Sequence, residues 1–190
     1  DNGSTDRSVD VLQQKFPSVR ILKLPANHGF CKGYNEALKQ VSADIYVLLN
    51  SDVEVTPGWL DPMLSLFGKD PAIASVQPKI LSHRSPDKFE YAGAGGGMID
   101  SLGYPFCRGR VFDHIENDMG QYNDVTEIFW SSGACMAIRS EVFHELGGFD
   151  EDFFAHMEEI DLCWRIHRTG KKVFYCGQST VYHLGAGTLA

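Results

Sequence analysis

The sequence lacks any long hydrophobic run, because no apolar stretch approaches the roughly 20 residues needed to cross a bilayer. It also lacks an excess of basic residues, since 17 Lys and Arg stand against 25 Asp and Glu, for a formal net charge of −8. An acidic chain is poorly suited to sequence-independent binding of nucleic acid or of an anionic membrane surface. We therefore expect a soluble globular protein with no nucleic-acid partner.

Paired cysteines are missing as well. The five cysteines are scattered and form no C-x-x-C pair, whereas a disulfide framework or a zinc site would show paired spacing. This usage predicts reduced thiols and a cytoplasmic protein. With 190 residues, 43% of them hydrophobic, the chain is long enough to fold as a single domain over residues 1–190.

The sequence shows no strand before its first loop-like residues. Residues 1–6 read Asp-Asn-Gly-Ser-Thr-Asp, which is loop chemistry of a kind that ordinarily follows a strand. We expect an α/β domain truncated at its N-terminus.

Strand-like and helix-like segments alternate along the chain, as in α/β folds. The order predicts a mixed, mostly parallel sheet with helices on both faces. Helices are predicted at 9–16, from about 35 to 41, at 57–67, 140–146 and 158–169, and strands at 19–24, 45–49, 73–81, 127–139, 172–175 and 180–183.

Residues 45–54 are the most informative segment. The apolar run Ile45–Leu49 is typical of a strand buried on both faces, and it stops at Asn50-Ser51-Asp52. A carboxylate at the carboxyl end of a buried strand lies where open α/β sheets bind ligands. Asp52 is therefore a candidate ligand for Mg²⁺ or Mn²⁺ bridging to phosphates, although Asn, Ser and Asp also favour a simple turn.

Acidic residues crowd the start of the helix predicted at 158–169. Glu158, Glu159 and Asp161 complement the helix dipole there, and Asp161 can pair with Arg165 four residues later. Apolar surroundings would instead raise a carboxyl pKa and suit the group to act as a general base. The sequence leaves both roles open. The apolar neighbours are Phe153, Phe154, Leu162 and Trp164.

Two further sets of residues each have two interpretations. His183 follows a strand and is either a metal ligand or a hydrogen-bonded structural residue. Asn27, Gly29, Gly33 and Asn35 either contact phosphates at a helix start or form only a turn and a cap. Residues 82–126, which lie between Asn35 and His183 in the sequence, are polar and Gly-rich. They are interpreted either as an irregular excursion that shapes a substrate cleft or as a mobile insertion.

Taken in order, these motifs resemble those of family 2 glycosyltransferases with the GT-A fold. The resemblance runs over essentially the whole chain, and within the family it is strongest to rhamnosyltransferase-like enzymes of bacterial surface polysaccharide assembly. The motifs that carry it are residues 1–6, 27–35, 48–52, 133–139, 147–151, 158–165 and 181–183.

The resemblance implies a nucleotide-sugar-binding half at residues 1–81 and an acceptor and catalytic half at residues 82–190. Asp1 would contact the base or ribose, Asp52 would bind Mn²⁺ or Mg²⁺, and His183 would add a metal or diphosphate contact. Trp130 would offer its ring to a sugar unless it lies in the core. The expected substrate-binding residues are Asp1, Asn2, Asn27, Gly33, Asn35, Ser51, Trp130 and Gly133.

The family's acidic pair is usually Glu-Asp, and its Asp is the general base. That position is Glu159 here, with Glu158 before it. Glu is one methylene longer than Asp, and a misplacement of about 1 Å can lower a rate ~10²-fold. The base therefore stays open among Glu159, Asp161 and Glu158.

The resemblance implies inverting transfer of a hexose or deoxyhexose from a dTDP- or UDP-sugar to a hydroxyl of a glycan or lipid-linked acceptor. A lipid-linked acceptor would place the protein at the inner face of the plasma membrane as a peripheral protein. Two alternatives stay open: a metal-dependent nucleotidyltransferase of related fold, and a catalytically silent binding module.

Overall fold

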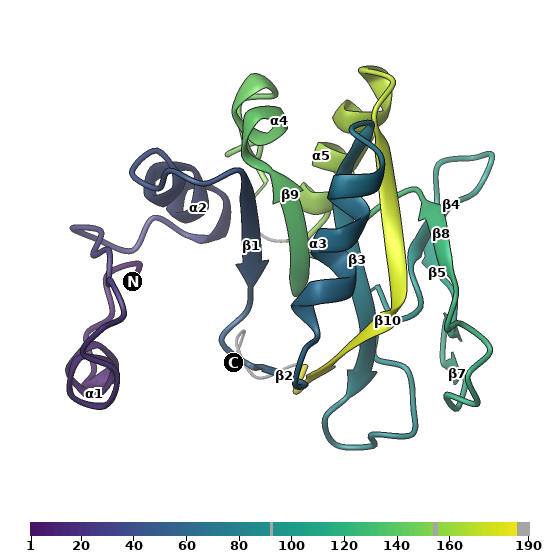
Figure 1. Cartoon of the computed structure of the whole chain (residues 1–190), viewed down its shortest axis with the longest axis horizontal. Coiled ribbons are helices and arrows are strands. Elements are labelled where there is room, and N and C mark those ends of the chain that lie inside the picture. The colour runs from purple at the N-terminus through teal and green to yellow at the C-terminus, as the bar shows by residue number, and fades with distance from the viewer. Residues whose placement is uncertain (92, 154–155, 186–190) are drawn as a thin grey trace.

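A mixed sheet of six strands runs through the computed structural model, which describes residues 1–91, 93–153 and 156–185 (Figure 1). Along the sheet the strands follow the order β1-β9-β3-β10-β2, and β8 pairs with β10 beside this path. The strands are β1 (Ile45–Leu49), β2 (Val53–Val55), β3 (Ile73–Ser82), β8 (Val125–Ile128), β9 (Cys135–Arg139) and β10 (Lys172–His183).

The strand directions correct one prediction. β1, β3 and β10 run the same way, but β9 enters antiparallel between β1 and β3. β2 and β8 also pair antiparallel to β10, so β3–β10 is the parallel pair among the described strands. The mixed α/β fold is confirmed, whereas "mostly parallel" is wrong. The reason is that β9, whose residues Cys135–Ile138 are fully buried, returns from a long connection into the middle of the sheet.

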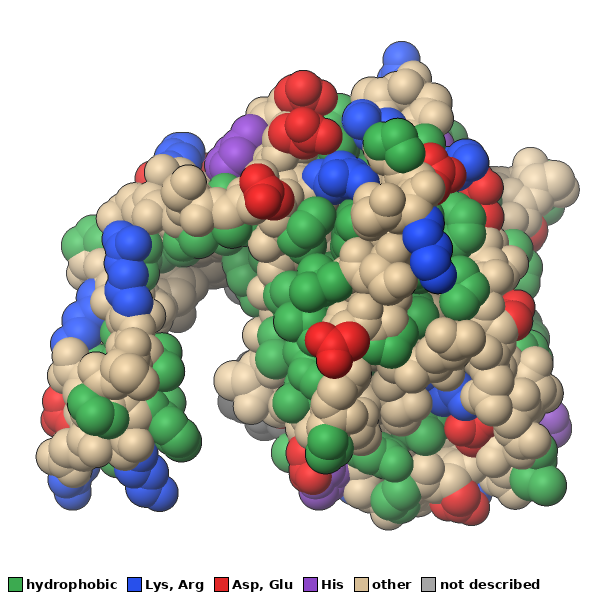
Figure 2. Space-filling view, in the orientation of Figure 1, with side chains coloured by type: hydrophobic (Ala, Val, Ile, Leu, Met, Phe, Trp, Pro, Cys, Tyr) green, Lys and Arg blue, Asp and Glu red, His purple; other side chains and the backbone are tan. Residues whose placement is uncertain are grey.

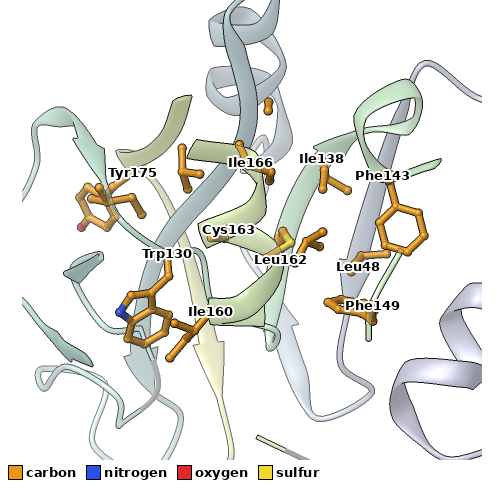
Figure 3. Close-up of a cluster of buried hydrophobic side chains, with 14 of the residues drawn as sticks. Leu48, Trp130, Ile138, Phe143, Phe149, Ile160, Leu162, Cys163, Ile166 and Tyr175 are labelled. Atoms are coloured by element: carbon orange, nitrogen blue, oxygen red, sulfur yellow. The ribbon is translucent and has the colours of Figure 1, made fainter. Parts of the chain in front are cut away.

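Helices cover both faces of the sheet, as predicted (Figure 1). α3 (Leu60–Lys69) packs on one face and α5 (Glu158–Arg168) on the other. Adjacent residues of β1 point to opposite sides, since Val47 packs with the cluster under α3 and Leu48 with the cluster under α5. Figure 3 shows the second cluster, in which Leu162, Cys163 and Ile166 of α5 lie near Leu48 and Ile138 of the sheet.

The remaining helices are α1 (Ser8–Lys15), α2 (Phe30–Leu38) and α4 (Ser140–Glu145). α1 buries no residue against the described part of the chain and stands apart from the sheet (Figure 2). None of the described helices has the length and apolar sequence needed to cross a bilayer.

Two strand predictions change along the chain. Residues 127–139 form two strands separated by residues 129–134, whereas the two strands predicted at 172–183 are one, β10. A register shift between Cys176 and Thr180 marks an irregularity in β10, where the sequence pattern is interrupted.

The predicted strand at residues 19–24 is not formed. The described residue that pairs with this segment is Asp1: the Asp1 ammonium donates to the Leu22 carbonyl (2.7 Å) and the Leu24 N–H donates to the Asp1 carbonyl (2.9 Å). Alternation of side chains was therefore not sufficient, because a strand also requires a partner for its backbone groups.

The segment 82–126 is not structureless. It carries a small sheet of β4 (Gly97–Ile99), β5 (Pro105–Cys107), β6 (Arg110–Val111) and β7 (His114–Ile115). Lys79 of β3 holds this excursion to the main sheet, since its buried ammonium donates to Asp118 (2.8 Å) and to Asn123. The excursion is therefore a fixed part of the molecule rather than a loose insertion.

Candidate active site

Asp52 and His183, which are 131 positions apart, meet at one edge of the sheet. β2 pairs with the end of β10, so that His183 faces Val53, and the Leu184 N–H donates to the Asp52 carbonyl (3.0 Å). As a result, Nε2 of His183 lies 3.2 Å from Oδ1 of Asp52. The predicted pair of metal residues is brought together.

A third residue, Glu90, completes this group and was missed by the sequence analysis. Its Oε2 lies 3.4 Å from Nδ1 of His183, on the other side of the ring from Asp52. Burial lowers the pKa of His183, but the carboxylates of Glu90 and Asp52 outweigh it and raise that pKa above its ordinary value. The signal in the sequence was weak, because Glu90 sits in a polar segment.

The residues at this edge fit a hard divalent cation. Oδ1 of Asp52 is buried and makes no hydrogen bond of good geometry to the described residues, although Nε2 of His183 lies 3.2 Å away, so that a carboxylate oxygen and a ring nitrogen face each other as candidate ligands. Within residues 1–91, 93–153 and 156–185, however, no three acidic, His or Cys side chains form a ready metal cluster. The imidazole separates Glu90 from Asp52. The protein would thus supply Asp52 and His183, and phosphate oxygens and water the remaining ligands.

Glu158 and Glu159, at the start of α5, form a second acidic centre. Glu158 is only 6% exposed, and one carboxylate oxygen of each residue is buried without a hydrogen-bond partner in the described part of the chain. Gly133 lies against both: a side-chain carbon there would come within 3.9 Å of Glu158 Oε1 and of Glu159 Cβ. Gly133 therefore lies next to the carboxyl group of Glu158 and the first carbon of the Glu159 side chain.

Burial raises the pKa of Glu159 to about 7, and the charge of Glu158 contributes to the rise. Backbone N–H groups, including that of Gly133, oppose part of it. A carboxyl group that titrates near neutral pH can accept a proton from an alcohol more readily than an ordinary glutamate. Burial and a like charge thus give Glu159 the property expected of a general base.

The backbone before this pair adopts an uncommon conformation. His156 and Met157 have φ values of 70° and 74°, in the left-handed region that side chains other than glycine rarely occupy. Such conformations cluster at functional sites, where the surrounding structure holds them in place. Of the predicted apolar neighbours, Leu162 is buried and Trp164 half-exposed, whereas Phe154 lies outside the described residues.

Asp161 has a structural role in the fold. Its carboxylate binds Arg165 (Nη2–Oδ2 2.7 Å), and the same guanidinium donates to the carbonyls of Leu146 and Gly148. This arrangement anchors the loop after α4 to α5. The ion pair gives Asp161 a structural partner, whereas Glu158 and Glu159 each have a buried carboxylate oxygen without a hydrogen-bond partner among the described residues, which favours these two as candidates for the base.

One backbone contact links the two centres. The Asn50 N–H, two residues before Asp52, donates to the Ala134 carbonyl (3.0 Å), next to Gly133. The turn that carries Asp52 is therefore joined to the segment that faces Glu158 and Glu159.

The predicted residues near the N-terminus also assemble. Asn2 donates from Nδ2 to Asn27 Oδ1 (3.1 Å) and to the Gly29 carbonyl (2.9 Å), and its amide lies on Gly33, where a Cβ would approach Nδ2 to 2.7 Å. Asp1 is exposed, and its Oδ1 accepts from the Ser4 N–H (3.3 Å). These contacts hold Asp1, Asn2, Asn27 and Gly33 in one unit at the start of α2.

A pocket of about 330 Å³ opens beside this unit. It is bounded on one side by the start of α2 and on the other by the segment that leads to the acidic pair. Its lining consists of Asn27, His28, Gly29, Phe30, Cys31, Lys32, Glu151 and Phe153.

Three predicted substrate residues lie elsewhere or have other partners. Asn35 is buried, and its amide binds the backbone of Phe149 in both directions (2.9 and 3.0 Å) and Glu151 Oε1 (3.2 Å), so that it holds a loop in place. Trp130 is 6% exposed in the core, where it packs on Gly97 and donates to the Met98 carbonyl (2.9 Å). Of the two interpretations of Trp130, the structure therefore supports a core residue over a ring that contacts a sugar. Ser51 is exposed in the turn before Asp52.

The model of the family described as glycosyl transferase family 2 matches residues 1–147. The chain belongs to glycosyltransferase family 2. Its motifs at Asp1–Asp6, Asn27–Asn35 and Leu48–Asp52 lie inside the match, whereas Glu158, Glu159 and His183 lie beyond it.

Curated relatives support the family assignment. An N-acetylglucosaminyl-diphospho-decaprenol L-rhamnosyltransferase of Mycobacterium tuberculosis is 30% identical over 201 residues, and the alignment covers 96% of this chain and 64% of the relative. The O-antigen biosynthesis protein RfbC of Myxococcus xanthus is 31% identical over 187 residues, covering 96% of this chain and 14% of that protein. The similarity to rhamnosyltransferases predicted from the motifs is confirmed, and the family 2 chain spans under two thirds of the length of these relatives.

Solved structures confirm the GT-A fold. GalNAc-T7 with UDP, GalNAc and Mn²⁺ superposes with a TM-score of 0.68 at 16% identity, covering 94% of this chain and 35% of that one. The mannosyltransferase PcManGT of Pyrobaculum calidifontis, in complex with GDP-Man and Mn²⁺, gives 0.66 at 16% identity and covers 100% of this chain and 47% of that one.

Proposed function

We propose that this family 2 domain transfers a hexose or deoxyhexose, with inversion, from a nucleoside diphosphate sugar to an acceptor hydroxyl. The observation that carries the proposal is the buried carboxyl pair Glu158–Glu159, joined through Gly133 and Ala134 to the edge that holds Asp52 and His183. Glycosyl transfer requires a base for the acceptor and a site for the departing diphosphate, and these two centres supply them.

Glu159 removes the proton of the attacking hydroxyl as its oxygen bonds to the anomeric carbon and the bond to the diphosphate breaks. Burial raises the pKa of the Glu159 carboxyl group to about 7, and the negative charge of Glu158 beside it favours proton uptake. Gly133 presents no side chain to an acceptor that approaches this pair. The backbone strain at His156 and Met157 is consistent with a fixed approach of the pair to the substrate.

Asp52 and His183 would hold Mn²⁺ or Mg²⁺. Such an ion stabilises the negative charge that develops on a leaving diphosphate. The solved structures of GalNAc-T7 with UDP, GalNAc and Mn²⁺ and of PcManGT with GDP-Man and Mn²⁺ support this part of the proposal. Asp1, Asn2 and Asn27, beside the pocket at the start of α2, would bind the nucleoside and its phosphates.

The acceptor is proposed to be a glycan or a lipid-linked glycan of surface polysaccharide assembly, and the donor a dTDP- or UDP-sugar. The mycobacterial relative, whose name includes a decaprenol-linked N-acetylglucosamine, supports a lipid-linked acceptor. In that case the protein would work in the cytoplasm, as a peripheral protein at the inner face of the plasma membrane.

Binding and turnover test the proposal separately. Calorimetric titration with UDP and with dTDP, each with and without Mn²⁺, should show metal-dependent binding that Asp52→Ala weakens sharply. Glu159→Gln should keep nucleotide binding and lose about 10²–10⁴-fold in kcat, because it removes the base but not the donor site.

The same measurements separate the alternatives. A nucleotidyltransferase would form a nucleotide sugar from a nucleoside triphosphate and a sugar phosphate, and a binding module would show no turnover for Glu159→Gln to reduce. Full activity of Glu159→Gln would contradict the assignment of the base.

A further inference from the structure

Two carboxylates flank the imidazole of His183, although the proposed metal pair includes one of them, Asp52. On the Nε2 side of the ring lies Asp52 (3.2 Å), and on the Nδ1 side lies Glu90 (3.4 Å). The side chains of His183 and Glu90 are only 11% and 10% exposed. A buried carboxylate therefore lies opposite the Nδ1 atom of a candidate metal ligand.

The backbone fixes the position of Glu90. Phe89 forms an antiparallel bridge with Leu81 of β3, and the Glu90 N–H donates to the Ile80 carbonyl (3.1 Å). Ser82, at the end of β3, lies opposite His183 of β10 in the parallel ladder. Residues 88–90 therefore run along β3 at the level where β10 presents His183.

The turn after His183 also closes on Glu90. Gly185 has a φ of 59°, and a Cβ at this position would come 2.7 Å from Glu90 Oε1. Glu90 is thus enclosed between β3 and the segment that follows β10, and its carboxylate has little freedom to turn away from the imidazole.

We propose that Glu90 is a positioning residue for His183, whose carboxylate faces Nδ1–H and keeps Nε2 directed at Asp52 and the cation. The inference rests on the proposed function, since it concerns the metal side of the same site. Histidines that bind metals ordinarily donate their other ring N–H to such a partner, which fixes the tautomer and the ring orientation. The 3.4 Å separation is longer than a good hydrogen bond, and catalytic contacts of this kind commonly tighten when the ligand binds.

The first test measures Mn²⁺ affinity by calorimetry in the presence of UDP. Glu90→Gln keeps the size of the side chain and removes its charge, and it should weaken Mn²⁺ binding about 10–100-fold. Glu54→Gln is the matched control, because Glu54 also contacts a histidine (His83, 3.0 Å) but its side chain is 68% exposed. The control should bind Mn²⁺ like the unchanged chain, and thermal unfolding should show both variants folded.

The second test uses ¹⁵N NMR of the histidine ring at alkaline pH without metal, a measurement that a merely structural role would not affect. His183 should carry its proton on Nδ1 in the unchanged chain and become a mixture of tautomers in Glu90→Gln. The same tautomer in both proteins would overturn the inference, as would Mn²⁺ binding by Glu90→Gln within about twofold of the unchanged chain, or an equal loss in Glu54→Gln.

The two tests keep this inference separate from the proposed function. If the unchanged chain binds no Mn²⁺ with UDP or dTDP, the metal part of the proposed function fails. The NMR result then still decides whether Glu90 sets the tautomer of His183.

Discussion

At the scale of single residues, the ionisation of Glu159 controls the proposed chemistry. The group accepts a proton only when it is ionised, and burial together with Glu158 raises its pKa to about 7. With this pKa, Glu159 would be a stronger base than an ordinary glutamate and would still be ionised in a large fraction of molecules at neutral pH.

This leads to a prediction for the pH–rate profile. Because the ionised carboxylate is the active form, kcat/KM should rise with pH and level off above a midpoint near 7. Glu158→Gln removes the neighbouring negative charge, so the midpoint should move to lower pH. The measurement is kcat/KM against pH for both proteins with a saturating metal concentration, and an unmoved midpoint in Glu158→Gln would contradict the coupling.

The residues of the site were predictable to different degrees. Asp52 and the pair Glu158–Glu159 stood out because each follows or begins a strongly patterned element. Glu90 did not, since its proximity to His183 depends on a turn in a polar segment that no periodicity describes. Trp130 was ambiguous because an aromatic residue looks the same in a core and at a sugar site, and only its hydrogen bond to Met98 and its packing on Gly97 decide.

At the scale of elements, Asn35 joins α2 to the loop at residues 149–151. Its amide is satisfied on both sides by Phe149 and Glu151, and Gly148 leaves no space for a larger side chain, as a Cβ there would meet Oδ1. The residue thus connects α2 with the segment that precedes the acidic pair.

Asn35→Ala should destabilise the protein by about 1–3 kcal/mol, because it leaves the buried N–H of Phe149 without its acceptor. The free energy of unfolding from urea titration measures the effect. Asn117→Ala, at an exposed position, is the control and should change stability little. Equal stability of Asn35→Ala and the unchanged chain would show that the contact does not hold the loop.

Elements with a long apolar pattern were predicted well, as β1, β3, α3 and α5 show, because periodicity reports burial directly. The predictions that failed are those that depend on which strands pair with one another. The segment 19–24 has the alternation of a strand and no neighbouring strand in the described residues, while β9 has a neighbour on each side that its own sequence does not specify. Pairing is a property of the whole chain, and a local pattern does not contain it.

At the scale of the whole molecule, stability is unevenly distributed. The sheet with α3 and α5 contains the buried clusters, whereas α1 buries no residue against the described part of the chain and stands away from the body (Figure 2). Elements with few buried contacts open at little cost in free energy.

Limited proteolysis should therefore cut first within residues 7–20 and leave the sheet intact. Trypsin has sites at Arg7, Lys15 and Arg20, and mass spectrometry of the early fragments identifies the order of cleavage. Sites in the fixed excursion, such as Arg108, whose guanidinium binds Asp124 and lies over the rings of Tyr122 and Tyr175, provide the internal comparison. Equal rates at both regions would contradict an uneven distribution of stability.

The antiparallel insertion of β9 between β1 and β3 also constrains how the molecule folds. β1 and β3 are close in sequence, but the strand that joins them lies more than 50 residues beyond β3. The centre of the sheet therefore cannot form until β9 has been synthesised. Its formation then brings together segments that are far apart in the sequence, which costs loop-closure entropy. Folding should be slow compared with a helical protein of this size, and the exposed edges of β1 and β3 would need protection from association until Cys135–Arg139 arrives.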